Sequence, residues 1–319
     1  MKIKDMNLGG HASMLGACAM WGLMAPVAKS SMTYGLNAFT LITFRVVGAA
    51  LCFWIASFFC KKKERVSDRD LFLFFFAALS AIVFSQCQFT IGLSYTSPID
   101  ASIITTMVPI FTLVLAAIFL HEPVTNKKVL GIFCGAIGAL LLITGSGASL
   151  SNERSGWFGD TLVLIAQFSF AVYLTLFKHL ISRYSVITCM KWMFTYASIT
   201  VIPFTYHQFY SLDMAALPLC VWGEVFYIVV GGTFVAYILM VYGQKRLRPT
   251  IVSMYNYTQP IVACGVSVAT GMGAFGITQA LAVFLVFGGV YLVTQSKSRA
   301  DVLRARQLKE RQNEDESSN

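Results

Sequence analysis

The chain has 319 residues, of which 56% are hydrophobic and only 12% are charged, and its formal net charge is +9. Soluble domains are about 45–50% apolar and about 25% charged, so this composition excludes an ordinary soluble domain and indicates a protein that crosses a membrane several times. The apolar runs are long and continuous instead of alternating, which favours membrane-spanning helices over a β-barrel.

The positive charge does not indicate a nucleic-acid partner, because the basic residues cluster at the ends of apolar runs. The eight cysteines are dispersed, with no CxxC or Cys/His cluster, so we expect buried free thiols and no metal site. Gly271–Gly276 spells GxGxxG between two apolar runs, with no βαβ unit around it, and we read it as a tight turn. The sequence therefore predicts no cofactor.

Ten membrane-spanning helices are predicted. The first has two lysines ahead of it, as a signal peptide would, but Trp21, Pro26 and Lys29 interrupt its core and nine further spans follow, so we expect it to be retained. The predicted spans cover residues 11–30, 37–60, 70–92, 98–120, 128–146, 156–182, 185–207, 216–244, 249–271 and 275–296.

The short loops predict the orientation. If ten spans alternate, nearly all the basic loop residues fall on one side, and the loops of the opposite side hold only Arg154. The positive-inside rule then places both termini in the cytoplasm, in a cell membrane. We expect residues 1–10 to form a cytoplasmic N-terminus and residues 297–319 to form a charged cytoplasmic tail, a fraying helix followed by disorder, with a binding tail as the alternative.

The chain contains an internal repeat. The pair Pro98 and Pro109 recurs as Pro249 and Pro260, at an offset of 249 − 98 = 151. The first spans of the two halves match at a slightly smaller offset of 178 − 29 = 149. These offsets superpose Ser102 on Ser253, Gly138 on Gly289, Lys29 on Lys178 and Arg45 on Phe194.

The repeat predicts two five-helix units, at residues 11–147 and 156–296. Five is an odd number, so the second unit enters the membrane from the opposite side. Such inverted repeats are typical of secondary transporters, in which two similar but upside-down halves exchange conformations around a midplane site. A duplicated scaffold without transport activity remains the alternative at this point.

The sequence resembles the drug/metabolite transporter superfamily, and within it the ten-helix EamA-type permeases. The resemblance covers about residues 11–296. It is carried by Trp21–Lys29 (WGLMAPVAK), Thr43–Ala50 in the second span, Gly92–Pro109, and the His121-Glu122-Pro123 turn before a glycine-rich span. The second half departs from the family's pattern where Met272 and Gly273 stand in place of a frequent glutamate.

The resemblance implies a permease for a small organic metabolite, with export of an amino acid or a related compound as the leading expectation and a proton or substrate gradient as the energy source. It also implies that the last spans of each repeat support homodimers. Gly131 and Gly135 form a GxxxG motif in the fifth span, which permits close packing but does not by itself establish a dimer.

Ionisable residues inside a membrane are costly, and each suggests a function. Lys29 and Lys178 either line the path or snorkel to the interface, and Arg45 either binds an anionic group or pairs with a carboxylate. Three of the acidic residues in or beside spans are candidates for gating or coupling. Asp100 suits a capping role at a helix start, Glu122 a salt bridge or gate with its neighbouring lysines, and Glu224 a proton carrier or an interfacial ion pair.

Neutral polar and aromatic side chains are the further candidates for substrate binding. A cavity between the halves would bring repeat-related faces of the fourth and ninth spans together, although helix-to-helix hydrogen bonds and packing against lipid are the alternatives. Pro26, Pro109 and Pro260 lie within spans and free backbone carbonyls there. The predicted substrate-binding set is Trp21, Arg45, Gln86, Gln88, Ser102, Thr105, Thr106, Trp192, Tyr196, Ser253, Tyr255 and Asn256.

The sequence leaves two other classes of function open. A membrane-embedded enzyme acting on a lipid or isoprenoid would need acidic, histidine or lysine side chains clustered on one membrane face, whereas the four histidines are scattered near span ends. A receptor or scaffold would not require the inverted repeat. A transporter that works by alternating access in the lipid bilayer is therefore the leading hypothesis.

Overall fold

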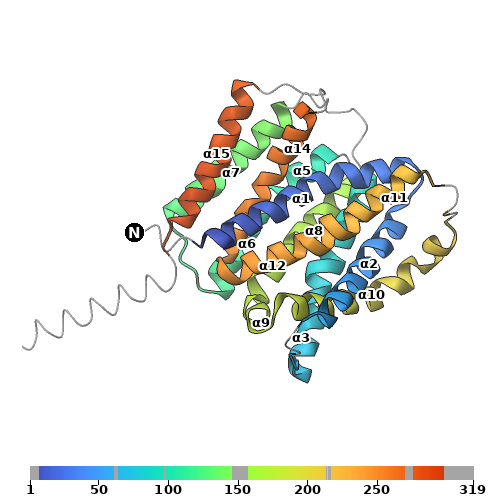
Figure 1. Ribbon diagram of the computed structural model, residues 1–319. Helices are drawn as coiled ribbons and strands as arrows, with labels where there is room; N and C mark the ends of the chain where they lie inside the picture. The colour runs from blue at the N-terminus through green and yellow to red at the C-terminus, as the bar shows by residue number, and fades with distance from the viewer. Residues whose placement is uncertain are drawn as a thin grey trace, which may run out of the picture.

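The computed structural model describes residues 7–60, 64–96, 98–145, 157–212, 214, 217–269 and 276–297. Every regular element within these ranges is helical, which confirms the predicted all-α fold (Figure 1). Six of the described helices are long and apolar enough to cross a membrane, and two shorter apolar helices accompany them. Each of the ten predicted spans coincides with one helix or with a series of helices along one rod.

The first half contains five rods. The third runs through a π-helix, η2, and the fourth is broken at Thr106 and Met107. The rods are α1 (Leu8–Thr33); α2 (Ala38–Phe58); α3 (Asp68–Ala78), η2 (Leu79–Cys87) and α4 (Gln88–Tyr95); α5 (Pro98–Thr105) and α6 (Val108–Phe119); and α7 (Asn126–Gly145).

The second half repeats this pattern. Its third rod runs through a second π-helix, η4, and its fourth passes through a 3₁₀ turn, η5. The rods are α8 (Trp157–Leu176) and α9 (Lys178–Arg183); α10 (Val186–Tyr210); α11 (Leu219–Phe226), η4 (Tyr227–Val235) and α12 (Ala236–Arg246); α13 (Pro249–Met254), η5 (Tyr255–Tyr257) and α14 (Thr258–Ala269); and α15 (Ile277–Thr294).

Side-chain caps fix several helix starts. The side chains of Asn37, Ser67 and Ser185 accept hydrogen bonds from backbone N–H groups in the first turns of α2, α3 and α10. Such caps satisfy donors that a helix start leaves without partners. The outer surface carries exposed apolar side chains such as Leu51, Phe76 and Phe284, as a lipid environment requires.

The packing follows the predicted inverted repeat. α1 packs against α12 and α14, and α8 packs in the same way against α4 and α6, with the halves exchanged. The remaining rods pair with their own counterparts, α2 with α10 and α7 with α15 (Figure 1). The two π-helices also correspond, because 227 − 79 and 235 − 87 both equal 148.

A seam of small residues joins α7 to α15. A Cβ on Gly131 would lie 2.7 Å from the carbonyl oxygen of Gly289, and a Cβ on Gly138 would lie 2.7 Å from that of Ala282. The offset of 151 maps each contact onto the other, so the pseudo-twofold axis passes through this seam. Gly131 of the GxxxG motif therefore permits close packing within one chain, and a homodimer stays a prediction.

Candidate functional site

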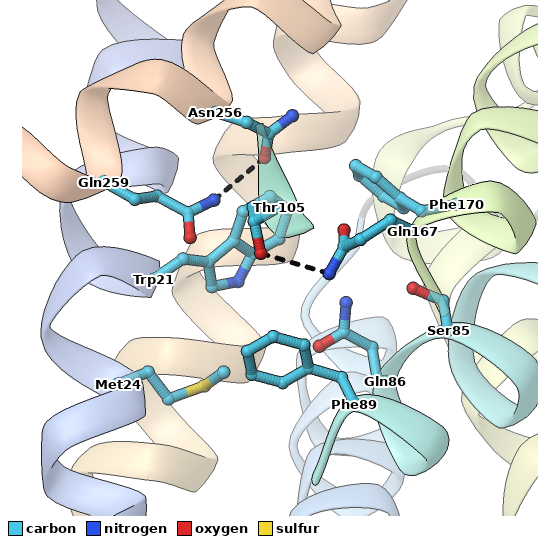
Figure 2. Close-up of a pocket in the computed structure, with 10 residues that line it drawn as sticks. All are labelled: Trp21, Met24, Ser85, Gln86, Phe89, Thr105, Gln167, Phe170, Asn256 and Gln259. Atoms are coloured by element: carbon cyan, nitrogen blue, oxygen red, sulfur yellow. Dashed lines mark hydrogen bonds between the residues drawn. The ribbon is translucent and has the colours of Figure 1, made fainter. Parts of the chain in front are cut away.

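A small cavity lies between the two halves. Its volume is about 40 Å³. Its lining side chains come from the first, third and fourth rods of the first half and the first and fourth rods of the second (Figure 2). The lining residues are Trp21, Met24, Ser85, Gln86, Phe89, Thr105, Gln167, Phe170, Asn256 and Gln259.

An aromatic pair from the first rod of each half forms one wall. Trp21 of α1 and Phe170 of α8 are repeat mates at the offset of 149, and their rings meet edge to face with centroids 5.9 Å apart. The indole Nε1 of Trp21 donates a hydrogen bond of 3.0 Å to the carbonyl oxygen of Gly232 in η4. This bond satisfies the buried donor and fixes the ring against the second half.

The broken fourth rods bring polar groups to the cavity. Pro109 and Pro260 have no N–H, so neither can donate to the carbonyl oxygen four residues earlier, which belongs to Thr105 and Asn256 respectively. Both of those residues line the cavity and are related by the offset of 151. Interrupted helices that present freed carbonyls at the midplane are a recurring way of building transporter sites.

Amide side chains complete these two faces. Gln167 Nε2 donates to Thr105 Oγ1 at 3.3 Å across the boundary between the halves, and Gln259 Nε2 donates to Asn256 Oδ1 at 2.8 Å. Figure 2 shows both bonds opposite Gln86, whose carboxamide points into the same space. The cavity is thus lined by neutral donors and acceptors beside aromatic rings, the usual composition of a small-molecule site.

A buried arginine lies behind the cavity. Arg45 is only 3% exposed, and its guanidinium donates from Nη2 to Gln86 Oε1 at 2.6 Å and from Nε to Thr233 Oγ1 at 2.9 Å. Both partners lie in π-helices, η2 and η4. π-Helices often occur at functional sites. In the described part of the chain no carboxylate lies within ion-pair distance of Arg45.

Arg45 also lines a second, smaller cavity of about 10 Å³. Met24 and Phe89 line both this cavity and the central one, so these two side chains separate the guanidinium from the central space. In Figure 2, Met24 reaches from the left toward the ring of Phe89, and Gln86 lies on the other side of that ring. A methionine side chain is unbranched and readily changes rotamer, which makes this partition movable.

The structure brings Trp21, Gln86, Thr105 and Asn256 of the predicted substrate-binding set to the central cavity, with Arg45 bonded directly behind Gln86. Ser102 lies on α5, but its side chain lies outside the described part. The others do not line the cavity, and their roles in binding stay predictions. Thr106 and Ser253 bond to backbone carbonyls, and Tyr255 bonds to His11. Gln88 has a buried Oε1 that has no partner among the described residues, and Trp192 and Tyr196 pack against Trp54 and Phe75.

Sequence reasoning did not identify six lining residues: Met24, Ser85, Phe89, Gln167, Phe170 and Gln259. Phe170 could have been found as the repeat mate of Trp21. Gln167 and Gln259 could also have been found, because each is an uncharged amide inside an apolar run, which is the reason Gln86 was predicted.

A buried ion pair stands at the end of the molecule where α6, α7 and α13 meet. Lys128 Nζ lies 2.7 Å from Glu122 Oε2, with side chains 0% and 9% exposed, which confirms the predicted salt bridge. Thr250 of the second half donates to the same oxygen at 3.1 Å. Glu122 therefore joins the two halves at this end.

The two lysines predicted to gate or couple donate to backbone carbonyls, and their role in gating or coupling stays a prediction. Lys178 Nζ donates to the carbonyl oxygen of Leu247, and Lys29 Nζ donates to that of Leu93, at 3.0 and 2.9 Å. In each half the lysine near the end of the first rod thus holds the end of the third. Positive charge suits the C-terminus of a helix, so both contacts are favourable there.

The opposite end of the molecule also carries bonds between the halves. Ser30 donates to Glu224 Oε1 at 2.6 Å, and Thr96 donates to Asp160 Oδ1 at 2.5 Å. The second carboxylate oxygen of Glu224 is buried and has no hydrogen-bond partner in the described part. The side chain of Asp100, like the Gly271–Gly276 segment apart from its last residue, lies outside the described residues.

Comparisons with known proteins agree with this architecture. The profile of the EamA-like transporter family matches residues 8–144 and again residues 157–295. An uncharacterized transporter of Bacillus subtilis, YyaM, is 22% identical over 89% of this chain and 87% of its own length. An uncharacterized transporter of Archaeoglobus fulgidus is 26% identical over 76% of this chain and 83% of its own.

Two further similarities differ in coverage and in sequence identity. A WAT1-related protein of Arabidopsis thaliana is 33% identical, but over 42% of this chain and 39% of its own length. One solved crystal structure superposes with a TM-score of 0.69 over 89% of this chain and 96% of its own, at 16% identity, which shows a shared fold.

Proposed function

Because this chain belongs to the EamA-like transporter family, we propose that it moves a small organic metabolite across the membrane by alternating access. The observation that carries the proposal is the central cavity, to which repeat-related residues of both halves contribute, Trp21 with Phe170 and Thr105 with Asn256. When two inverted halves share one site, rocking one half against the other exposes that site to either side of the membrane.

The conformation in the structure is a contracted one. A cavity of about 40 Å³ accommodates a few water molecules, whereas pockets for small organic ligands span roughly 300 Å³ or more. Hydrogen bonds between the halves are present at both ends, at Glu122 with Thr250 and at Glu224 with Ser30. Loading therefore requires one of these ends to separate, which is the motion that alternating access supplies.

Export of an amino acid or a related compound from the cytoplasm is the specific activity that we propose. The basic loops support an orientation with both termini in the cytoplasm of a cell membrane. A proton gradient or exchange against a second substrate would drive the transport. Glu224 is the proposed proton carrier, because it is an acidic side chain within a membrane span and its Oε2 is buried without a hydrogen-bond partner among the described residues.

Counterflow in proteoliposomes tests the proposal. The purified chain is reconstituted and loaded with unlabelled amino acids and related metabolites, and uptake of each labelled compound is followed with and without a pH gradient. We expect accumulation of at least one compound. Absence of flux for every solute, together with turnover of a lipid or isoprenoid, would instead favour the membrane-embedded enzyme.

Glu224→Gln tests the coupling separately. We expect this variant to retain counterflow but to lose the dependence of net flux on the pH gradient, because the amide cannot take up a proton. Ser30→Ala is the matched control, since it removes the hydrogen bond to Oε1 and keeps the carboxylate. Unchanged proton-linked flux in Glu224→Gln would exclude Glu224 as the carrier.

A further inference from the structure

Arg45 is a buried cation that has no carboxylate partner in the described part of the chain. A charge removed from water is costly unless it is paired, and buried arginines normally have carboxylate partners. The partners of Arg45 in the described part of the chain are neutral, the carboxamide of Gln86 and the hydroxyl of Thr233. A negative charge on a bound solute would therefore supply the counter-ion that the described residues do not give Arg45.

The fold does not require a charge at this position. The repeat mate of Arg45 is Phe194 in α10, which is 1% exposed and packs edge to face against Tyr237 at 5.2 Å. Tyr237 is in turn the counterpart of Phe89 at the offset of 148, and Phe89 lines the small cavity with Arg45. The same frame thus accommodates an apolar ring in one half and a guanidinium in the other.

The guanidinium also has a route to the central cavity. Its Nη2 engages Gln86 Oε1, which leaves the Gln86 Nε2 donor available toward the cavity that Gln86 lines. Met24 and Phe89 separate the two cavities, and Met24 is the flexible member of that partition. A change of the Met24 rotamer would merge the cavities and place the guanidinium at the edge of the central one.

We propose that the solute bound in the central cavity carries a carboxylate, and that this carboxylate takes Arg45 as its counter-ion once Met24 has moved aside. This inference rests on the proposed transport function and specifies its substrate class. One guanidinium balances one negative charge, and neither cavity is lined by a second cation among the described residues, which favours a monocarboxylate over a phosphate dianion. A planar carboxylate also suits the planar fork of donors that arginine presents.

Paired acids and amides test the proposal by thermal stabilisation of the purified full-length chain. The probes are phenylalanine, leucine, methionine and benzoate, each compared with its primary amide. We expect at least one acid to bind about tenfold or more tightly than its amide. Arg45→Gln should bring that ratio close to one, and Arg65→Gln, which removes an exposed arginine that lines neither cavity, should preserve it.

Equal binding of acid and amide to the wild type, an unchanged ratio in Arg45→Gln, or binding of none of the acids would each overturn the proposal. If Arg45→Gln is not monodisperse, Met24→Ala decides the question, because it opens the partition and leaves Arg45 in place. It should strengthen acid binding more than amide binding, and an equal change in both would refute the proposed contact.

Counterflow with the same pairs separates this inference from the proposed function. If amides are transported as fast as acids, the proposed carboxylate contact is wrong, but the proposed transport function stands. If no solute is transported but acids still bind more tightly than amides, and Arg45→Gln removes that preference, the transport function is wrong and the carboxylate site stands.

Discussion

The ion pair between Lys128 and Glu122 makes the end of the molecule where α6, α7 and α13 meet sensitive to a single substitution. Lys128→Met keeps the length of the side chain but leaves the Glu122 carboxylate buried with only the Thr250 hydroxyl as its remaining side-chain partner among the described residues. Removing one member of a buried pair costs about 3–5 kcal/mol. This cost falls on the closed state, because Glu122 is hydrated when this end opens. The opening equilibrium should therefore shift a hundredfold or more toward the open state.

Thiol labelling measures this shift. Ser253 is fully buried in α13, one turn beyond Thr250, so Ser253→Cys should react with a membrane-impermeant reagent only when this end opens. We expect slow labelling of Ser253→Cys alone and much faster labelling in combination with Lys128→Met. The parent chain, whose native cysteines include the exposed Cys220, gives the background.

The double variant Glu122→Leu with Lys128→Met tests whether the effect comes from the unpaired Glu122 carboxylate. Apolar replacement of both members of a buried pair is often neutral or stabilising, so labelling should return toward the slow rate. If the double variant labels as fast as Lys128→Met, or if Lys128→Met labels no faster than Ser253→Cys alone, the ion pair does not hold this end closed.

Three further predictions follow from packing, backbone and charge. Gly131→Ala should lower the melting temperature by the equivalent of roughly 1–3 kcal/mol, because its Cβ would press on the α15 backbone at 2.7 Å. Gly223→Ala should not, because its Cβ would meet no atom of the described residues within 4 Å. Pro109→Ala restores the N–H that the Thr105 carbonyl lacks, so counterflow should slow without loss of melting temperature, and unchanged flux would argue against a role for the break. Partial burial raises the pKa of the Glu64 carboxyl, but hydrogen bonds from the start of α10 and a nearby lysine outweigh it and leave the pKa below its ordinary value of 4.5. The stabilisation from Glu64 is therefore present above pH 4.5 and lost as the pH falls below it, and Glu64→Gln should narrow the difference in melting temperature between pH 7 and pH 4.

The architecture could be predicted from the sequence for two reasons. Membrane-spanning helices require long apolar runs, and the internal repeat can be recognised from the proline pairs in the sequence. The predicted span at residues 185–207 corresponds to α10 at Val186–Tyr210, with Ser185 as its cap. The fold class and the two inverted repeats are confirmed. The offset of 151 also located Thr105 and Asn256, since helices broken by repeat-related prolines have few other places to present their freed carbonyls.

The rest of the site could not be predicted, because in a membrane protein apolar faces meet lipid, other helices and the cavity alike. Trp192 and Tyr196 were placed in the site as aromatic residues inside a span, but α10 packs them against α2 and α3. The π-helices have no apolar period that distinguishes them from α-helices, so the sequence did not show that Gln86 and Thr233 would converge on Arg45. That convergence depends on tertiary packing across the two halves.

The seam between α7 and α15 offers an internal reference for measuring the motion of the other helices. Its two glycine contacts exchange under the pseudo-twofold operation, so a rearrangement that swaps the conformations of the halves leaves the seam as it was. Spin labels on exposed positions of these helices, such as Phe133 and Phe284, would therefore report a constant distance. Any label pair elsewhere could be calibrated against it, and its changes assigned to transport instead of to the detergent or the lipid.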